Sequence, residues 1–224
     1  GLRSGENPAR WKGHLDQLLP KHRKSSRRHH PAMAWANIPN FLRLLEKRDG
    51  TAALALRFLI LTATRTTEVL EARWTEIDFA NSTWTIPPER MKARREHRVP
   101  LSETALVILK QARGKHKEFV FPGPDDAGPM SNMALLMLLR RMGRDDTTVH
   151  GMRSTFRDWA SECTNFSNEV CEMALAHVVE NATEAAYRRG DLFDKRRKLM
   201  LSWASYCEPR TGAKVLPLKR KLGY

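Results

Sequence analysis

Hydrophobic residues follow helical spacing in the segment after the polar N-terminal stretch. Pro39 is placed to open a helix whose apolar residues recur three and four positions apart. Thr51 is expected to cap a second helix, and most of its positions through residue 61 are apolar, so this helix should lie deep in the core. A break at residues 64–66 separates it from a shorter predicted helix over residues 68–72.

The next stretch has the composition of β-strands. Residues 82–86 are β-branched and aromatic, and residues 98–101 form a second extended run. The charged residues between them, 87–97, therefore predict a hairpin loop with Lys92 near its tip.

The rest of the chain predicts helices separated by turns that contain Asn, Gly or Asp. Ser102 and Ser131 are placed as N-caps of two of them, and residues 119–121 form a brief extended piece. The predicted helices cover residues 103–113, 132–142, 151–162, 168–176, 183–188 and 193–206. The predicted fold class is therefore mainly α (α+β), with one small antiparallel sheet.

The two ends of the chain differ from its middle. Residues 1–31 are polar and carry a basic run, which we interpret as a short helical end of an upstream segment followed by a linker. Residues 32–224 are predicted to form one main domain, of which residues 207–224 are a basic C-terminal tail.

The charge balance indicates that the partner of this chain is negatively charged. The chain has 39 Lys and Arg against 25 Asp and Glu, a formal net charge of +14. Such a surplus attracts polyanions and favours a nucleic-acid-binding protein. It distinguishes neither DNA from RNA nor catalysis from passive binding.

The number and spacing of the cysteines and the length of the apolar runs argue against a disulfide-rich, metal-binding or membrane protein. The three cysteines form no Cys-x-x-Cys pair, so we expect neither a disulfide framework nor a metal site. No apolar run approaches the ~18 residues of a membrane span, and the first residues lack the apolar stretch of a signal peptide. We therefore predict a cytoplasmic protein.

Two local patterns suggest a phosphate site. Glu68, three residues after Arg65, is placed to hold that guanidinium, although the same spacing fits a purely structural ion pair. His150 and Arg153 are expected to project to one side of a helical first turn, beside free backbone N–H groups. A capping histidine and a surface arginine remain the alternative, and Arg157 competes with Arg153 for the same role.

Three further candidates are weaker when each is considered alone. Nothing in composition selects Lys92 from its basic neighbours, and His177 fits a helix C-cap. Tyr187 lies between small residues and arginines and should be reachable by a substrate, whereas Tyr206 on an amphipathic helix is expected to pack.

Together these segments resemble the catalytic domain of tyrosine recombinases, most closely the integrases of phages and genomic islands. The segments that carry the resemblance are Thr62-Ala-Thr-Arg-Thr-Thr-Glu68, the hairpin from Ile86 through Lys92 to Ser102, Val149-His-Gly-Met-Arg-Ser-Thr-Phe156, Leu175-Ala-His177 and Ala186-Tyr-Arg188. One departure is Ala63, where the family often has Gly.

The resemblance implies a transesterification that needs no metal, ATP or other cofactor. In it Tyr187 attacks the scissile phosphate and forms a 3′-phosphotyrosine, Arg65 and Arg153 bind the non-bridging oxygens, and His150 acts as general base. Lys92 protonates the leaving 5′-oxygen and His177 donates a hydrogen bond to the phosphate. Glu68 supports the site, and the expected DNA contacts are Arg94, Arg95, Arg98 and Arg188.

The resemblance also implies partners and a place in the cell. It predicts double-stranded DNA attachment sites, a tetramer of protomers on DNA, a monomer as a possible state of the isolated domain, and integration or excision of a prophage or genomic island at the bacterial nucleoid. Residues 1–31 would end a core-binding domain, and residues 193–206 and the tail could pack on a neighbouring protomer. The alternatives are a type IB topoisomerase and a DNA-binding module without catalysis.

Overall fold

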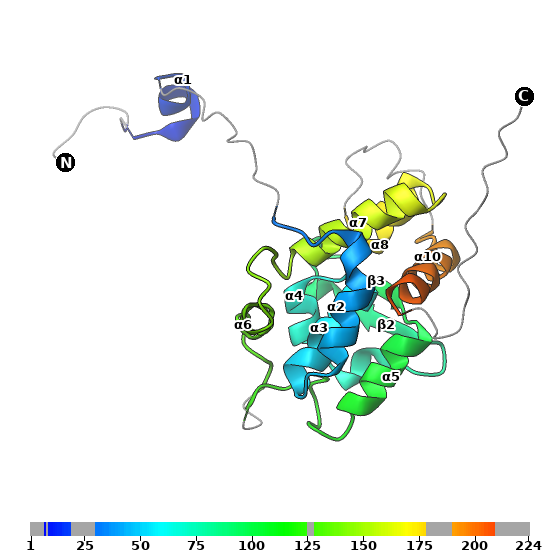
Figure 1. The fold of residues 1–224 in the computed structure, drawn as a ribbon. Coiled ribbons are helices and arrows are strands. Elements are labelled where there is room, and N and C mark those ends of the chain that lie inside the picture. The colour runs from blue at the N-terminus through cyan, green and yellow to red at the C-terminus, as the bar shows by residue number, and fades with distance from the viewer. Residues whose placement is uncertain (1–6, 8, 19–29, 125–127, 178–189, 209–224) are drawn as a thin grey trace, which may run out of the picture.

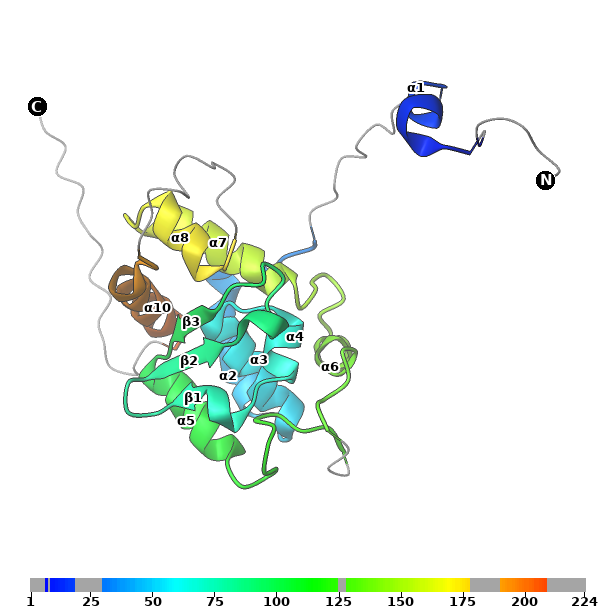
Figure 2. The same ribbon diagram turned by 180° about the vertical axis from the view of Figure 1, so that it is seen from behind.

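A computed structural model describes residues 7, 9–18, 30–124, 128–177 and 190–208 (Figure 1). It confirms the predicted class, because helices surround one three-stranded antiparallel sheet. Figures 1 and 2 place α2 on one side of the body and the strands on the other, with α3 between them.

The central helix is α3 (Thr51–Thr62), whose residues from 55 to 62 are all buried. It packs against α2 (Ile38–Glu46), α5 (Glu103–Ala112) and α6 (Ala134–Arg141). Its cap differs from the prediction. Gly50 occupies the N-cap with φ 101°, a conformation that favours glycine, and Thr51 is the first helical residue.

A tight turn joins α3 to α4 (Thr66–Leu70). Ala63 ends α3 in the left-handed conformation, with φ 51° and ψ 27°. A Cβ makes that conformation costly, which explains why glycine suits this position. The turn places Arg65 at the N-cap of α4, which begins two residues earlier than the predicted start at residue 68.

The sheet has the order β1-β2-β3. The predicted hairpin is confirmed: β2 (Thr83–Ile86) pairs with β3 (His97–Pro100), with Ile86 opposite His97. Strand β1 (Ile77–Asp78) was not predicted, because two residues are too few for an alternating pattern. Short 3₁₀ turns at Trp35–Asn37, Trp74–Glu76 and Pro88–Arg90 connect these elements.

The later helices match the predicted ones closely. They are α5, α6, α7 (Gly151–Cys163), α8 (Asn168–Ala174) and α10 (Phe193–Cys207). Ser102 caps α5 as expected, accepting a hydrogen bond from the Ala105 N–H at 3.2 Å. α6 begins two residues later than predicted, and the Ser131 hydroxyl accepts from Met133 N–H in the turn before it. The helix predicted at 183–188 lies outside the described residues.

Helix α10 packs on its own domain, and the expectation that this segment also packs on a neighbouring protomer stays a prediction. Trp203 is fully buried and lies 4.9 Å from Trp159 and 5.5 Å from Phe156, measured between ring centroids. Tyr206 stacks beside it at 5.9 Å, so its predicted packing role is confirmed. The tail beyond residue 208 lies outside the described part of the chain.

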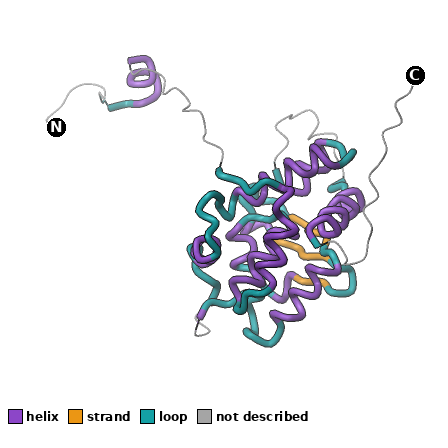
Figure 3. Tube along the Cα trace, in the orientation of Figure 1, coloured by secondary structure: helices purple, strands orange, loops and turns teal. Residues whose placement is uncertain are grey.

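The N-terminal segment contributes little to this body. A distorted turn at Trp11–Leu15 and α1 (Asp16–Leu18) lie apart from the other helices in both views (Figures 1 and 2). Figure 3, coloured by secondary structure, shows the orange strands lying among the purple helices of the body. Within the described ranges, no helix combines the length and apolarity needed to cross a membrane.

Candidate active site

Arg65 is held by Glu68 in the way that their spacing predicts. The two oxygens of Glu68, which is 2% exposed, accept from the Arg65 backbone N–H at 2.7 Å and from its Nη1 at 2.8 Å. Nη2 of Arg65 donates to the carbonyl of Ala176 at 3.2 Å. Arg65 therefore links the start of α4 to the end of α8.

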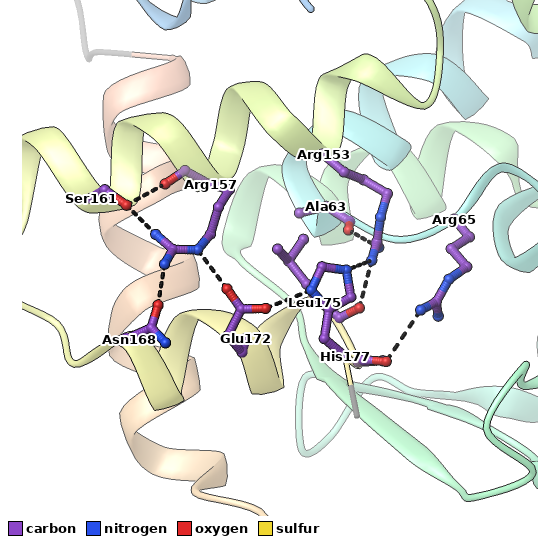
Figure 4. Close-up of polar contacts among 10 residues, drawn as sticks. Ala63, Arg65, Arg153, Arg157, Ser161, Asn168, Glu172, Leu175 and His177 are labelled. Atoms are coloured by element: carbon purple, nitrogen blue, oxygen red, sulfur yellow. Dashed lines mark hydrogen bonds and ion pairs between the residues drawn. The ribbon is translucent and has the colours of Figure 1, made fainter. Parts of the chain in front are cut away.

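Arg153 lies in the first turn of α7 and is 5% exposed. Its Nη1 donates to the carbonyl of Ala63 at 2.5 Å, and its Nη2 donates to the carbonyl of Leu175 at 2.6 Å (Figure 4). Both guanidiniums therefore donate to the backbone directly after α8, at the neighbouring carbonyls of Leu175 and Ala176.

This arrangement concentrates positive charge in a buried place. Burial and the neighbouring Arg65 lower the pKa of Arg153 to about 10, while Glu68 and Glu172 act in the opposite direction. Among the described residues, no carboxylate lies within ion-pair distance of Arg153. Two guanidiniums, one of them buried without a carboxylate partner, form a site for an anion such as a phosphate.

His177 joins this pair, and its ring does more than end a helix. Its Nδ1 lies 2.6 Å from a Glu172 oxygen, and its Nε2 lies 3.3 Å from Nη2 of Arg153. The backbone N–H of His177 donates to the Glu172 carbonyl at 3.0 Å, as a residue at a helix end does. The imidazole is half exposed beside the arginines.

Arg157 does not compete for the phosphate site. Its Nε donates to Glu172 at 2.7 Å, and its two terminal nitrogens donate to Ser161 and Asn168 (Figure 4). All of its donor groups are therefore directed at α7 and α8, which leaves Arg153 as the arginine that faces Arg65.

His150 occupies the N-cap position of α7, one residue before the predicted helix interior. Its ring lies 4.6 Å from that of His30, edge to face. It makes no capping bond. Instead the Thr148 hydroxyl accepts from the Gly151 N–H at 3.0 Å. Burial, and then the charges of His30, Arg153, Arg65 and His177, lower the pKa of His150, so its neutral, proton-accepting form is favoured.

Gly151 was overlooked in the sequence and allows a close approach of the chain. A Cβ at this position would lie 2.1 Å from the Pro31 carbonyl oxygen. The same oxygen accepts from the Thr148 N–H at 3.0 Å. A glycine in the first turn of a helix was the available signal, because glycine is a poor helix former.

His97, which precedes Arg98 in β3, was also overlooked. It is 8% exposed, and burial together with Arg196, Arg153 and Arg65 lowers its pKa to about 3. The ring is therefore neutral near pH 7 and adds no charge to the arginine site. Its alternation with outward-facing Arg98 was the signal that could have predicted an inward position.

The hairpin cations are not part of the hydrogen-bonded network. Lys92, Arg94 and Arg95 are exposed, and Arg94 has a left-handed φ of 52°. Arg98 lies over the ring of Phe193, 4.1 Å from its centroid, and 3.9 Å from an Asp191 oxygen. Their proposed contacts with DNA remain predictions.

Tyr187 and Arg188 lie outside the described residues. The structure thus brings together Arg65, Glu68, His150, Arg153 and His177, and leaves Lys92 on an exposed loop. In the part of the chain that is described, no three His, Cys, Asp or Glu residues are grouped so as to hold a metal ion.

Comparison with known proteins agrees with this fold. The model of the phage integrase family matches residues 33–192. The chain belongs to the phage integrase family.

Two relatives are similar in sequence to most of this chain. The prophage integrase IntA of Escherichia coli is 37% identical over 191 residues, which are 81% of this chain and 45% of the relative. The integrase of Enterobacteria phage P4 is 35% identical over 202 residues, covering 81% of this chain and 46% of the relative. The chain thus spans about half the length of these relatives.

Solved structures support the fold. An integrase from mycobacterium phage Brujita has a TM-score of 0.59 at 19% identity, covering 86% of this chain and 63% of that one. The Tn1549 transposon integrase in complex with circular intermediate DNA has a TM-score of 0.55 at 16% identity, covering 85% and 69%. A lambda integrase tetramer bound to a Holliday junction has a TM-score of 0.52 at 16% identity, covering 67% and 48%.

Proposed function

We propose that this chain is the catalytic part of a site-specific DNA recombinase, an integrase that inserts or excises a mobile element through a 3′-phosphotyrosine intermediate. The observation that carries the proposal is that Arg65 and Arg153 donate to the adjacent carbonyls of Ala176 and Leu175, which brings the two guanidiniums to one place. Family membership supports the same reaction.

In the proposed cleavage step the Tyr187 phenol oxygen bonds to phosphorus as the bond to the 5′-oxygen breaks. The phenol proton passes to His150, and Lys92 gives a proton to the departing 5′-oxygen. A 5′-hydroxyl from another strand then attacks the phosphotyrosine and reverses these transfers. Because the phosphodiester energy is kept in the tyrosine link, the step requires no ATP.

The positive charge of the site would lower the free-energy cost of ionising the Tyr187 phenol. A phenol has a pKa of ~10, so ionising it at neutral pH costs roughly 4 kcal/mol. Arg65 and Arg153 would stabilise the negative charge that builds on the phosphate oxygens in the transition state. The lowered pKa of His150 keeps its ring neutral and able to accept the phenol proton.

The net charge of the chain and its similarity to other integrases support a proposal for DNA binding and for the assembly of protomers. A net charge of +14 favours binding to double-stranded DNA, with Arg94, Arg95, Arg98 and Arg188 as contacts. We extend to this chain the tetramer seen for lambda integrase on a Holliday junction, and place it at the bacterial nucleoid in the cytoplasm. Residues 1–31 would end a core-binding domain and form its linker.

The two alternatives are less well supported. A type IB topoisomerase could use the same groups, but the curated relatives are integrases. A binding module without catalysis would gain nothing from burying Arg153 beside Arg65, because exposed cations bind DNA phosphates at lower cost.

A covalent trapping assay tests the proposal. The probe is a pool of randomised DNA duplexes with a 5′-bridging phosphorothiolate, incubated with the chain in EDTA. We expect a protein–DNA adduct that resists SDS, and its loss in Tyr187→Phe with DNA binding retained. An adduct formed by Tyr187→Phe, or none formed by the wild-type chain on the pool, would overturn the proposal. Relaxation of plasmid DNA without attachment sites would favour the topoisomerase.

A further inference from the structure

The imidazole of His177 lies between two groups with opposite hydrogen-bonding capacity. On one side, the Glu172 carboxylate lies 2.6 Å from Nδ1. On the other, Nη2 of Arg153 lies 3.3 Å from Nε2. A carboxylate only accepts hydrogen bonds and a guanidinium only donates them. The proton of the neutral ring must therefore lie on Nδ1, with Nε2 as an acceptor.

Glu172 is itself fixed in place. Its second oxygen accepts from Nε of Arg157 at 2.7 Å, and Arg157 is held in turn by Ser161 and Asn168 (Figure 4). Burial would raise the pKa of the Glu172 carboxyl, but hydrogen bonds from Arg157 and His177 outweigh it and lower the pKa. Glu172 is therefore an anion throughout the range in which imidazoles titrate, between about pH 5 and 8.

This arrangement constrains how His177 can meet a phosphate. The ring can donate to a phosphate oxygen only from Nε2, because Nδ1 already donates its hydrogen bond to Glu172. Nε2 has no proton in the neutral form, so donation requires the imidazolium, with the second proton taken from solvent water. The charged groups that face the ring are Glu172 on α8, Arg153 on α7, Arg65 at the start of α4 and, through its charge, His150.

We propose that Glu172 is a positioning residue that keeps the Nδ1 proton of His177 in place, so that His177 binds the scissile phosphate as an imidazolium. The inference rests on the proposed function. In it, Arg157 fixes the position of the Glu172 carboxylate through a hydrogen bond. The phosphate then meets three cations rather than two, and its binding is coupled to the uptake of one proton.

The first test reads the tautomer without DNA. NMR of the chain labelled with ¹⁵N in its imidazoles, with His177→Asn to assign the signal, should show the Nδ1–H tautomer. Inorganic phosphate should convert the ring to the form protonated on both nitrogens. In Glu172→Gln the ring should stay neutral at the same pH and phosphate concentration. An Nε2–H tautomer in the free wild-type chain, or no protonation with phosphate, would overturn the inference.

The second test follows adduct formation on the phosphorothiolate pool against pH. Glu172→Gln should slow it by roughly ten- to hundredfold, the worth of one charge-assisted hydrogen bond. Because the proposed binding of phosphate takes up one proton, the loss should grow as the pH rises. Glu172→Asp keeps the charge and should restore part of the rate.

Controls separate positioning from general damage. Glu169→Gln makes the same chemical change at an exposed position of α8 and should leave the rate and its pH profile unchanged. Adding Glu172→Gln to His177→Asn should cause no further loss, because both act through one ring. Additive losses, or a wild-type pH profile in Glu172→Gln, would contradict the inference. A wild-type chain that shows the expected tautomer but forms no adduct would refute the proposed function instead.

Discussion

Arg153 donates a 2.5 Å hydrogen bond to the carbonyl of Ala63, two residues before Arg65. This contact joins the first turn of α7 to the turn between α3 and α4. It means that the position of one active-site arginine depends on the backbone conformation that presents the other. The left-handed Ala63 is thus part of the site's construction as well as a helix end.

Replacing Arg153 by Lys should separate catalysis from binding. A single ammonium cannot donate in a fork to the Ala63 and Leu175 carbonyls and also to a phosphate. We expect adduct formation to fall by roughly 10²–10³-fold, with DNA affinity at low salt nearly unchanged. Arg141→Lys, at an exposed position of α6, is the matched control and should retain the wild-type rate. Equal losses in both variants would argue against a phosphate-binding role for Arg153.

Ala63→Gly tests the strain in the turn. Relief of the left-handed conformation should offset the lost methyl burial, so the free energy of unfolding should change by less than about 0.5 kcal/mol. Ala55→Gly, equally buried inside α3 but in a helical conformation, should cost about 1–2 kcal/mol. Urea denaturation of both variants measures the difference. Similar costs at the two positions would mean that Ala63 is not strained.

Gly151→Ala should disturb the contact between the linker and α7. The added Cβ would lie 2.1 Å from the Pro31 carbonyl oxygen, so the backbone must shift. We expect a loss of about 1–3 kcal/mol in unfolding free energy, as for an overpacked core. Gly190→Ala is the control, because a Cβ there meets nothing within 4 Å. Thermal denaturation that shows no destabilisation specific to Gly151→Ala would contradict the close approach.

His97 should make the fold sensitive to acid. Its pKa is lowered to about 3 in the folded chain, chiefly by burial, whereas an unfolded imidazole titrates near 6.5. Below about pH 6.5 the unfolded state binds the extra proton, so stability is lost as the pH falls. Between about pH 7 and pH 5 the loss due to His97 should be roughly 2 kcal/mol. Urea denaturation at both pH values should show a smaller loss in His97→Gln, and an equal loss would rule out His97 as the cause.

His30→Ala should change the pH dependence of cleavage. Burial is the largest cause of the lowered pKa of His150, followed by the charge of His30, whose ring lies 4.6 Å away. Removing His30 should let the pKa of His150 rise, so that His150 becomes protonated at a higher pH. The acid limb of adduct formation should then move to higher pH, while His14→Ala, on the separate N-terminal segment, should leave it in place.

Much of the fold could be predicted because its signals are local. The apolar run of α3, the β-branched residues of β2 and the Ser102 cap each depend on neighbours within a few positions. The contact between Arg65 and Glu68 is also a local signal, because a spacing of three residues along a helical turn brings the two side chains together. Strand β1 was not predicted because two residues are too few to show an alternation of apolar and polar positions.

The sequence by itself determined which residue types are available and in what order, and the order of its motifs identified the candidates. The tertiary structure alone decided that Arg153 reaches Ala63, that Arg157 holds Glu172 and that Pro31 lies against Gly151. These partners lie on different elements, and their distances depend on how helices pack around α3. Spacing along one helix cannot specify such contacts, because burial and long-range hydrogen bonds arise only when the elements meet.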